Sequence, residues 1–178
     1  NMLALINDML SKDHPGEPVL VVSDRPEAQG LMLAKSKNVD TAIVNYKKFA
    51  SRQDYEEKLK KLITSSGAEI ICLAGFLRIL SPNFVNSFEN SILNVHPSIL
   101  PLFKGLGTHA KALLSGMTIH GATVHLVSEE LDSGEILGQG ITKIIEGDTI
   151  NILADRVLKL EHKLYPLVLR NFLKKETG

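Results

Sequence analysis

Short β-branched runs alternate with amphipathic helical patterns through the first hundred residues of this chain. This alternation predicts an α/β fold, with a mostly parallel twisted sheet flanked by helices. The run at residues 70–74 is apolar on both faces, as expected for a parallel strand that is covered on both sides. The predicted strands are residues 19–23, 41–44, 70–74 and 92–96, and the predicted helices begin at Met2, Glu27, Arg52 and Ser81.

The second part of the chain has a different pattern. Residues 97–107 carry two prolines and two glycines, which predicts a long loop. A helix at 108–114, a long strand at 119–127, a hairpin partner at 136–145 and a helix at 149–174 are predicted to follow. We therefore expect an antiparallel C-terminal part, and a single domain over residues 1–178 whose halves meet near residue 96.

Composition excludes several classes of protein. Lys and Arg number 20 and Asp and Glu number 20, so the chain lacks the basic excess that nucleic-acid binding requires. No apolar run approaches the roughly 18 to 20 residues of a membrane span, and no secretory signal is present. The single cysteine, Cys72, indicates a reducing compartment, so we expect a soluble cytoplasmic protein.

A pair of polar residues ends the predicted strand at 92–96. Asn94 and His96 lie two residues apart and so project to the same face of the strand, which Pro97 then stops. Ligands of open α/β sheets bind at this edge. An amide donor suits a developing oxyanion and imidazole carries protons near neutral pH, although a strand-end histidine bonded to backbone has the same pattern.

Asp132 is the candidate carboxylate partner for His96, although Asp-x-Gly is also the pattern of a plain turn. His120 and His125 are separated by an odd number of residues, so on a straight strand they point to opposite faces and cannot share a metal ion. The chain has no zinc-binding spacing, and we expect no metal. The GLGTHA run at 105–110 follows no strand, which argues against a dinucleotide site.

Four motifs occur in an order that resembles the folate-dependent formyltransferases. They are LAGFLRIL at 73–80, NVHPSILP at 94–101, GATVH at 121–125 and LDSG at 131–134. The first of these, with Glu161 and His162 on the last helix, narrows the resemblance to the phosphoribosylglycinamide formyltransferases. The likeness implies a Rossmann-like formyltransferase fold. It runs from Asn1 to about Phe172.

The resemblance implies transfer of a formyl group from 10-formyltetrahydrofolate, as co-substrate, to the amine of glycinamide ribonucleotide in de novo purine (IMP) biosynthesis. It makes His96 the catalytic acid and base, Asn94 the holder of the formyl oxygen, and Asp132 the support of His96. The folate-binding positions it implies are Arg52, Leu77, Arg78, Ile79, Leu80, Asn94, Ser128, Glu129, Glu130, Leu131 and Asp132. The ribonucleotide-binding positions it implies are Asn1, Gly75, Pro97 and Glu161.

The chain departs from the family at two places. The family begins with a hydrophobic strand and a Gly-Ser-Asn phosphate loop, of which only Asn1 is present here, so we expect a first strand and phosphate loop to precede it. Gly107 stands where many relatives carry a second histidine in the loop.

Other functions stay open on the sequence alone. A formyltetrahydrofolate hydrolase shares the core, and so does methionyl-tRNA formyltransferase, although zero net charge weighs against the latter. A ligand-binding module without catalysis is the alternative outside the enzymes, and the complete set of Asn94, His96 and Asp132 speaks against it. The expected partners are small-molecule substrates, with neither nucleic acid nor membrane, and the chain is a monomer or a homodimer.

Overall fold

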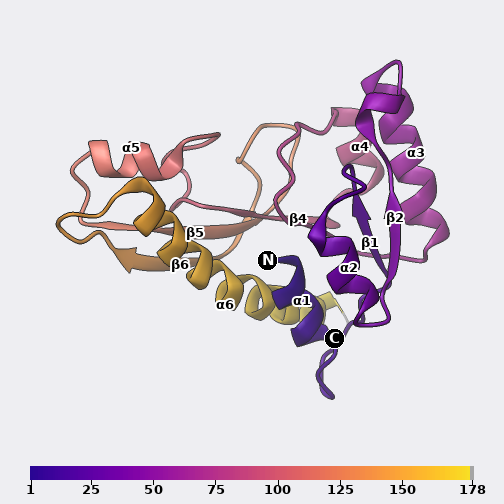
Figure 1. The fold of residues 1–178 in the computed structure, drawn as a ribbon, viewed down its shortest axis with the longest axis horizontal. Coiled ribbons are helices and arrows are strands. Elements are labelled where there is room, and N and C mark those ends of the chain that lie inside the picture. The colour runs from indigo at the N-terminus through magenta and orange to yellow at the C-terminus, as the bar shows by residue number, and fades with distance from the viewer. Residues whose placement is uncertain (177–178) are drawn as a thin grey trace. The chain divides into compact units, whose positions relative to one another are not determined.

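The computed structural model describes residues 1–176, and the chain divides into two compact units (Figure 1). One unit comprises Met2–Ile71, and the other comprises Asn1 together with the residues from Cys72 onward. Residues 177 and 178 of the expected 1–178 domain lie outside the described residues. The expected division into halves near residue 96 stays a prediction.

The first unit is built on a pair of parallel strands, in which Leu20 lies opposite Asp40. Ile6, Ala34 and Val39 form a buried cluster in this unit. Burial of these apolar side chains therefore joins α1 and α2 and the start of the second strand. The elements of this unit are α1 (Met2–Met9), β1 (Leu20–Ser23), α2 (Gln29–Lys35), β2 (Asp40–Ile43), the short 3₁₀ helix η1 (Tyr46–Lys48) and α3 (Arg52–Ser65).

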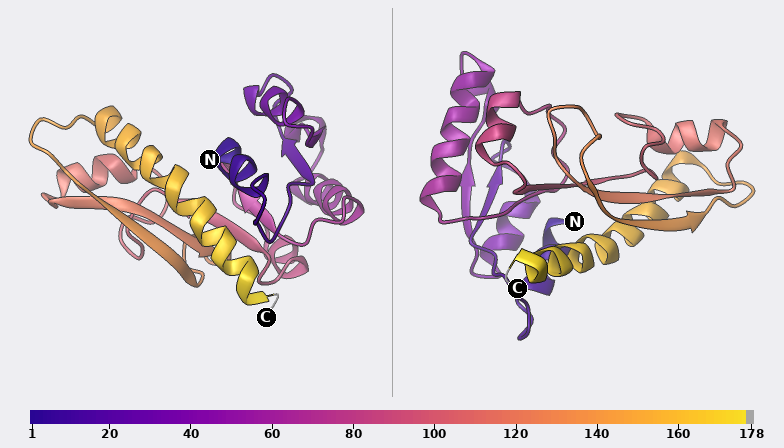
Figure 2. Two further views of the ribbon diagram at one scale, coloured as in Figure 1. Left: turned by 90° about the horizontal axis from the view of Figure 1, so that it is seen from below. Right: turned by 180° about the vertical axis from the view of Figure 1, so that it is seen from behind.

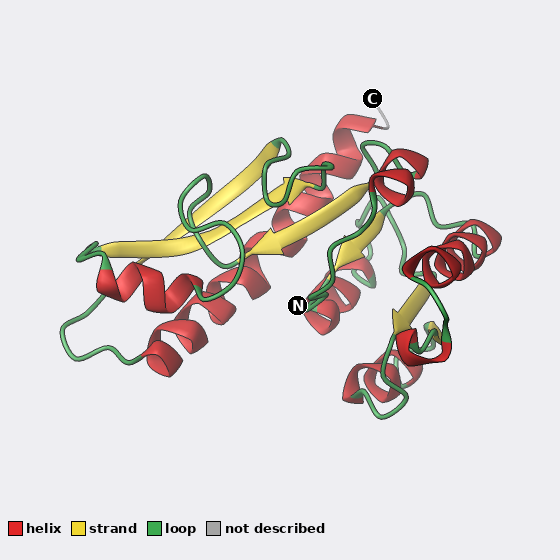
Figure 3. Ribbon diagram, turned by 90° about the horizontal axis from the view of Figure 1, so that it is seen from above, coloured by secondary structure: helices red, strands yellow, loops and turns green. Residues whose placement is uncertain are grey.

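The second unit contains a four-stranded sheet in the order β3-β4-β5-β6, drawn in yellow in Figure 3. Strand β5 is antiparallel to both β4 and β6. The α/β class and the antiparallel C-terminal part are thus confirmed. The elements of this unit are β3 (Ile71–Leu73), α4 (Pro82–Ser87), β4 (Ile92–His96), α5 (Thr108–Leu114), β5 (Ile119–Leu126), β6 (Ile136–Lys143) and α6 (Ile150–Glu176).

Local sequence accounts for the ends of the short helices. Ser81 caps α4 by accepting a hydrogen bond from the Phe84 amide at 3.2 Å, and Pro82 occupies the first helical position. Gly107 precedes α5 with a left-handed backbone, at φ 74°. Among residues 1–176, no helix combines the length and the apolar character that a membrane crossing requires.

Helix α6 packs along β5 and β6, as Figures 1 and 2 show. Its buried stripe includes Leu153, Val157 and Val168. The helical period of the sequence predicts Leu167 on the same face, but this side chain is 56% exposed. Tyr165 lies in the stripe instead and is fully buried. Glycines of β6 allow the close approach, since a Cβ at Gly140 would lie 2.9 Å from the Leu160 side chain. The sheet and helix therefore leave no room for larger side chains here.

We expect Gly121→Ala to destabilise the second unit by about 2 kcal/mol, because overpacking forces the backbone to shift. A Cβ at Gly121 would overlap the backbone carbonyl of Gly140 on the paired strand. Urea unfolding measures the change. Gly30→Ala in α2 is the control, because its added methyl meets only the Met2 side chain at 3.6 Å. Equal stabilities of the two variants would contradict this packing.

Candidate active site

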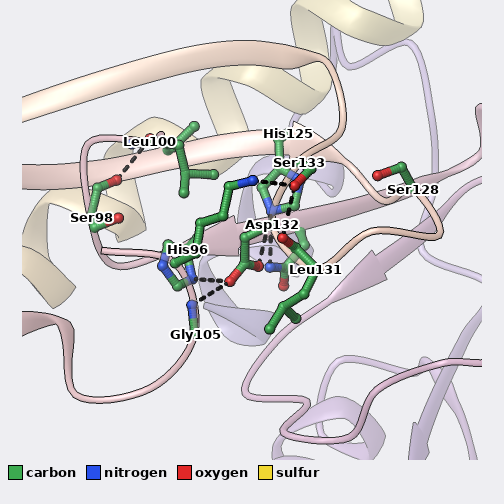
Figure 4. A network of polar contacts seen from close by, with 12 residues as sticks. His96, Ser98, Leu100, Gly105, His125, Ser128, Leu131, Asp132 and Ser133 are labelled. Atoms are coloured by element: carbon green, nitrogen blue, oxygen red, sulfur yellow. Dashed lines mark hydrogen bonds and ion pairs between the residues drawn. The ribbon is translucent and has the colours of Figure 1, made fainter. Parts of the chain in front are cut away.

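Strand β4 places Asn94 and His96 on one face of the sheet, as the alternation of strand side chains predicts. The antiparallel register sets His125 of β5 opposite Asn94, and Thr123 opposite His96. His96 is 6% exposed and His125 is 2% exposed. The two histidines therefore belong to a largely buried polar cluster, and Figure 4 shows them from close by together with Asp132.

Both ring nitrogens of His96 face oxygen atoms. Nε2 lies 3.0 Å from the backbone carbonyl of Phe103, and Nδ1 lies 3.4 Å from Oδ2 of Asp132. A carbonyl only accepts hydrogen bonds, so Nε2 carries a proton that it donates to Phe103. Nδ1 is therefore the nitrogen that is free to gain or lose a proton beside the carboxylate.

Asp132 reaches this cluster from the loop at residues 128–134. Its Oδ2 accepts a hydrogen bond from the Gly105 amide at 2.8 Å, and its Oδ1 lies 3.7 Å from Nε2 of His125. The side chain is 8% exposed. The carboxylate therefore lies between the His96 and His125 rings.

His125 is a member of the cluster that the sequence did not reveal. Burial lowers the pKa of His125, while the Leu126 carbonyl and Asp132 oppose that shift. Its Nδ1 donates to the Leu126 carbonyl at 2.8 Å, which leaves Nε2 of the neutral ring as an acceptor. The Asn94 amide nitrogen lies 3.3 Å from this Nε2. His125 therefore orients the Asn94 amide, with its nitrogen toward β5.

The loop that carries Phe103 and Gly105 is anchored to β5 and β6 by polar contacts. Thr123 Oγ1 donates to the Ser98 carbonyl at 2.7 Å and accepts from the Leu100 amide at 3.0 Å. The Gln139 side chain donates to the Leu100 carbonyl at 2.9 Å. These contacts fix the path of residues 98–100, and so the approach of Phe103 to His96.

A second histidine pair lies beside the same loop. His109 Nδ1 is 3.2 Å from His120 Nε2, and the rings meet edge to face with centroids 5.3 Å apart. Burial, reinforced by the charge that His109 would carry, lowers the pKa of His120 to about 4. His120 and His125 therefore belong to different clusters.

The depressed pKa of His120 predicts a loss of stability in acid. An unfolded chain binds this proton near pH 6.5, whereas the folded chain resists it until about pH 4. The contribution of His120 is complete above pH 6.5 and is lost as the pH falls toward 4. We expect His120→Gln to flatten the fall in unfolding free energy across this window, measured by urea unfolding at several pH values. An unchanged slope would contradict the burial argument.

Asn1 and Glu161, the first and last of the predicted ribonucleotide-binding residues in the sequence, are in contact in the structure. Asn1 Nδ2 donates to Glu161 Oε2 at 2.6 Å, and Glu161 on α6 is 7% exposed. Burial raises the pKa of Glu161, and the bond from Asn1 opposes the rise. Gly75 turns the chain after β3 with φ 66°, and Pro97 directly follows β4.

Besides Asn94 on β4, the predicted folate-binding residues lie on three segments. Leu77 and Ile79, which follow β3, are 78% and 61% exposed, so their apolar side chains are available to a ligand; Arg78 is exposed beside them, and Leu80 is half-buried. Arg52 begins α3 in the first unit, where it pairs with Glu56 at 3.8 Å.

The third of these segments is the loop at 128–134. Ser128 Oγ donates to the Glu130 carbonyl at 3.0 Å, and Glu129 accepts from Asn86 at 2.9 Å. Leu131 is 48% exposed next to Asp132. In the part of the chain that the structure describes, no three His, Cys, Asp or Glu side chains are placed to hold a metal ion.

Comparison with known proteins gives a consistent result. The family model described as Formyl transferase matches residues 1–169. The chain is 35% identical to phosphoribosylglycinamide formyltransferase of Haemophilus influenzae over 97% of this chain and 81% of that protein. It is 39% identical to the trifunctional purine biosynthetic protein adenosine-3 of Gallus gallus over 96% of this chain, but spans 17% of that longer protein.

A solved structure of phosphoribosylglycinamide formyltransferase from Brucella melitensis superposes with a TM-score of 0.92. The two sequences are 46% identical, and the match covers 97% of this chain and 88% of that chain. These matches confirm the resemblance inferred from the four motifs and the expected formyltransferase fold. Since the matched residues run through Asn94, His96, Asp132 and Glu161, the chain belongs to the formyl transferase family.

Proposed function

We propose that this chain transfers the formyl group of 10-formyltetrahydrofolate to the amine of glycinamide ribonucleotide, a step of de novo purine biosynthesis. The contact of Asp132 with His96, at 3.4 Å beside Asn94, is the observation that carries the proposal. It supplies a proton carrier, its carboxylate partner and an amide donor at one strand end. Membership of the formyl transferase family supports a folate-derived formyl donor.

The reaction begins when the amine lone pair attacks the formyl carbon and the carbonyl electrons move to oxygen. The Asn94 amide donates to the resulting oxyanion, and His96 Nδ1 does so once it has taken the proton from the attacking nitrogen; loss of one such donor costs about 3 kcal/mol. The attacking nitrogen loses a proton and the departing N10 gains one. His96 Nδ1 carries this proton, which is general acid–base catalysis worth roughly 10²–10⁴-fold.

Asp132 supports the protonated ring. Its Oδ2 is the acceptor nearest Nδ1, and the Gly105 amide holds that oxygen in place at 2.8 Å. A carboxylate beside an imidazole favours the imidazolium form that the proton transfer requires. Its other oxygen faces His125, which in turn orients Asn94. The Asp132 carboxylate therefore contacts His96 directly and reaches Asn94 through His125, and these are the two residues that would bind the formyl oxygen.

Asn1 and Glu161 offer hydrogen-bond acceptors to the amine and hydroxyl groups of the ribonucleotide. Glu161 presents a buried carboxylate, and Oδ1 of Asn1 is a buried acceptor without a hydrogen-bond partner within residues 1–176. Buried polar atoms of this kind cost free energy unless a ligand pairs with them. The exposed Leu77 and Ile79 offer apolar surface to the folate ring. Zero net charge and the single cysteine favour small-molecule substrates and a cytoplasmic enzyme.

The test mixes the protein with 10-formyltetrahydrofolate, with and without glycinamide ribonucleotide, and follows tetrahydrofolate release by absorbance. We expect release only when the amine is present. Equal release without the amine would support the hydrolase instead. A third mixture contains methionyl-tRNA in place of the ribonucleotide, and release only in that mixture would support the tRNA-modifying relative. Binding of the folate without turnover under any condition would support a module without catalysis.

A further inference from the structure

Two loops meet beside Asp132. The first loop carries Phe103 and Gly105, the second is the loop at residues 128–134, and two consecutive residues of the first contact the second. The Gly105 amide donates to the Asp132 carboxylate at 2.8 Å. The preceding residue, Lys104, donates from Nζ to Glu130 Oε1 at 3.2 Å and also to Ser133 Oγ. The Lys104 ammonium therefore binds the 128–134 loop at residues on both sides of Asp132 in the sequence. The backbone amide of the next residue, Gly105, binds the Asp132 carboxylate itself.

The backbone at Asp132 needs such support. Its φ of 49° lies in the left-handed region, which is unfavourable for a residue with a side chain. Ser133 Oγ accepts a hydrogen bond from the Lys104 ammonium and donates one to the Leu131 carbonyl at 2.9 Å. This second bond links the two residues that flank Asp132. Glu130 joins the same network, since its carboxylate accepts a hydrogen bond from Lys104 Nζ.

Lys104 is itself fixed at its backbone. Its carbonyl accepts a hydrogen bond from Lys111 Nζ of α5 at 3.2 Å. Its side chain is 37% exposed, which is less than that of a free surface lysine, and its ammonium has two partners rather than one. An isolated exposed ion pair contributes little to stability, but the two partners of the Lys104 ammonium lie on either side of Asp132 in the sequence.

We propose that Lys104 is a positioning residue for formyl transfer: it holds the 128–134 loop so that the Asp132 carboxylate stays against His96. The proposal rests on the proposed function. Within residues 1–176, the hydrogen bonds of the Lys104 ammonium go to Glu130 and Ser133 rather than to His96 or the Asp132 carboxylate, so it acts through the loop. Correct placement of reacting groups is worth large rate factors, and a displacement of about 1 Å can cost 10²-fold.

The first experiment compares Lys104→Met, Lys104→Arg and the wild-type chain in amine-dependent formyl transfer. We expect Lys104→Met to lower kcat about tenfold with an unchanged KM for the ribonucleotide, because alignment is lost but the ribonucleotide contacts are not. Lys104→Arg should recover most of the rate, since a guanidinium also donates to Glu130 and Ser133. A wild-type kcat in Lys104→Met, or no recovery with arginine, would overturn the proposal.

The matched control is Lys61→Met in α3. Lys61 pairs with Glu57 at 3.6 Å as an exposed lysine–glutamate pair of the first unit, so the substitution removes the same charge and the same kind of contact. We expect its kcat to equal that of the wild type. An equal loss of kcat in Lys61→Met would show an effect of net charge and would overturn the positioning role.

A double-mutant comparison tests whether Lys104 acts through Asp132. In the Asp132→Asn background, Lys104→Met should produce little further loss of kcat, because the group that it positions has already lost its charge. The same tenfold factor in both backgrounds would show that Lys104 acts elsewhere, and would overturn the proposal.

Amide hydrogen exchange supplies a readout that does not depend on activity. The Gly105 amide is bonded to Asp132, so loosening the loop should raise its exchange rate about tenfold in Lys104→Met and leave it unchanged in Lys61→Met. An unchanged rate in Lys104→Met would overturn the proposal. If the wild-type chain transfers no formyl group, the proposed function fails, while this exchange measurement still decides whether Lys104 holds the loop.

Discussion

Replacing His96 with alanine is expected to lower kcat for formyl transfer at least ~10³-fold while the chain stays folded. The substitution removes Nδ1, the atom placed 3.4 Å from Asp132, and with it the proposed proton carrier and one proposed donor to the oxyanion. The rate is measured as amine-dependent release of tetrahydrofolate. Circular dichroism and the thermal midpoint report whether the fold is retained.

The matched histidine control is His162→Ala. His162 is exposed on α6, so its loss should leave kcat close to the wild-type value. Near-normal turnover by His96→Ala would contradict the assignment of His96 as the proton carrier. A folded His96→Ala protein with no detectable turnover, beside an active His162→Ala protein, is the result that the site geometry predicts.

Asp132→Asn is expected to lower kcat about 10²-fold and to change its pH profile. Asparagine keeps the size of the side chain and an oxygen for the Gly105 amide, but it removes the charge between His96 and His125. The measurement is kcat across a range of pH for the variant and the wild type. A wild-type rate and an unchanged profile would mean that Asp132 is only a turn residue.

Local sequence patterns were sufficient to predict the elements of the fold. Strand β4 and helix α5 lie at 92–96 and 108–114, with the bounds that the sequence predicts. Pro97 ends the strand because it cannot donate to the ladder, and Gly107 marks the start of α5. The burial stripe of α6 was less predictable, since Tyr165 is buried and Leu167 is exposed. Tertiary packing against β5 and β6 decides between neighbouring helix positions.

The active site was predictable only in part. Alternation along one strand places Asn94 and His96 together, because that period is a local property. His125 lies opposite Asn94 because of the register between β4 and β5, which no period within either strand reveals. The Phe103 carbonyl and the Gly105 amide are backbone groups of a loop with left-handed residues, so their positions depend on three-dimensional packing.

The roles of Leu77, Arg78 and the other implied folate-binding positions stay predictions, as do those of Asn1 and Glu161 toward the ribonucleotide. The geometry of the second unit gives these residues unequal support. Asn1 and Glu161 contact each other directly at 2.6 Å, whereas Arg52 lies in the first unit and pairs with Glu56 there. Substitution of Glu161 is therefore expected to raise the KM for the ribonucleotide more than the KM for the folate.

Formyl transfer to the ribonucleotide is tested most directly by following the formyl carbon itself. 10-Formyltetrahydrofolate labelled with carbon-13 at the formyl group is mixed with glycinamide ribonucleotide and the protein, and the carbon resonance is followed by NMR. We expect the label to move to an amide formed on the ribonucleotide amine, and we expect His96→Ala to abolish this transfer. Appearance of the label as free formate, with the ribonucleotide unchanged, would contradict this expectation.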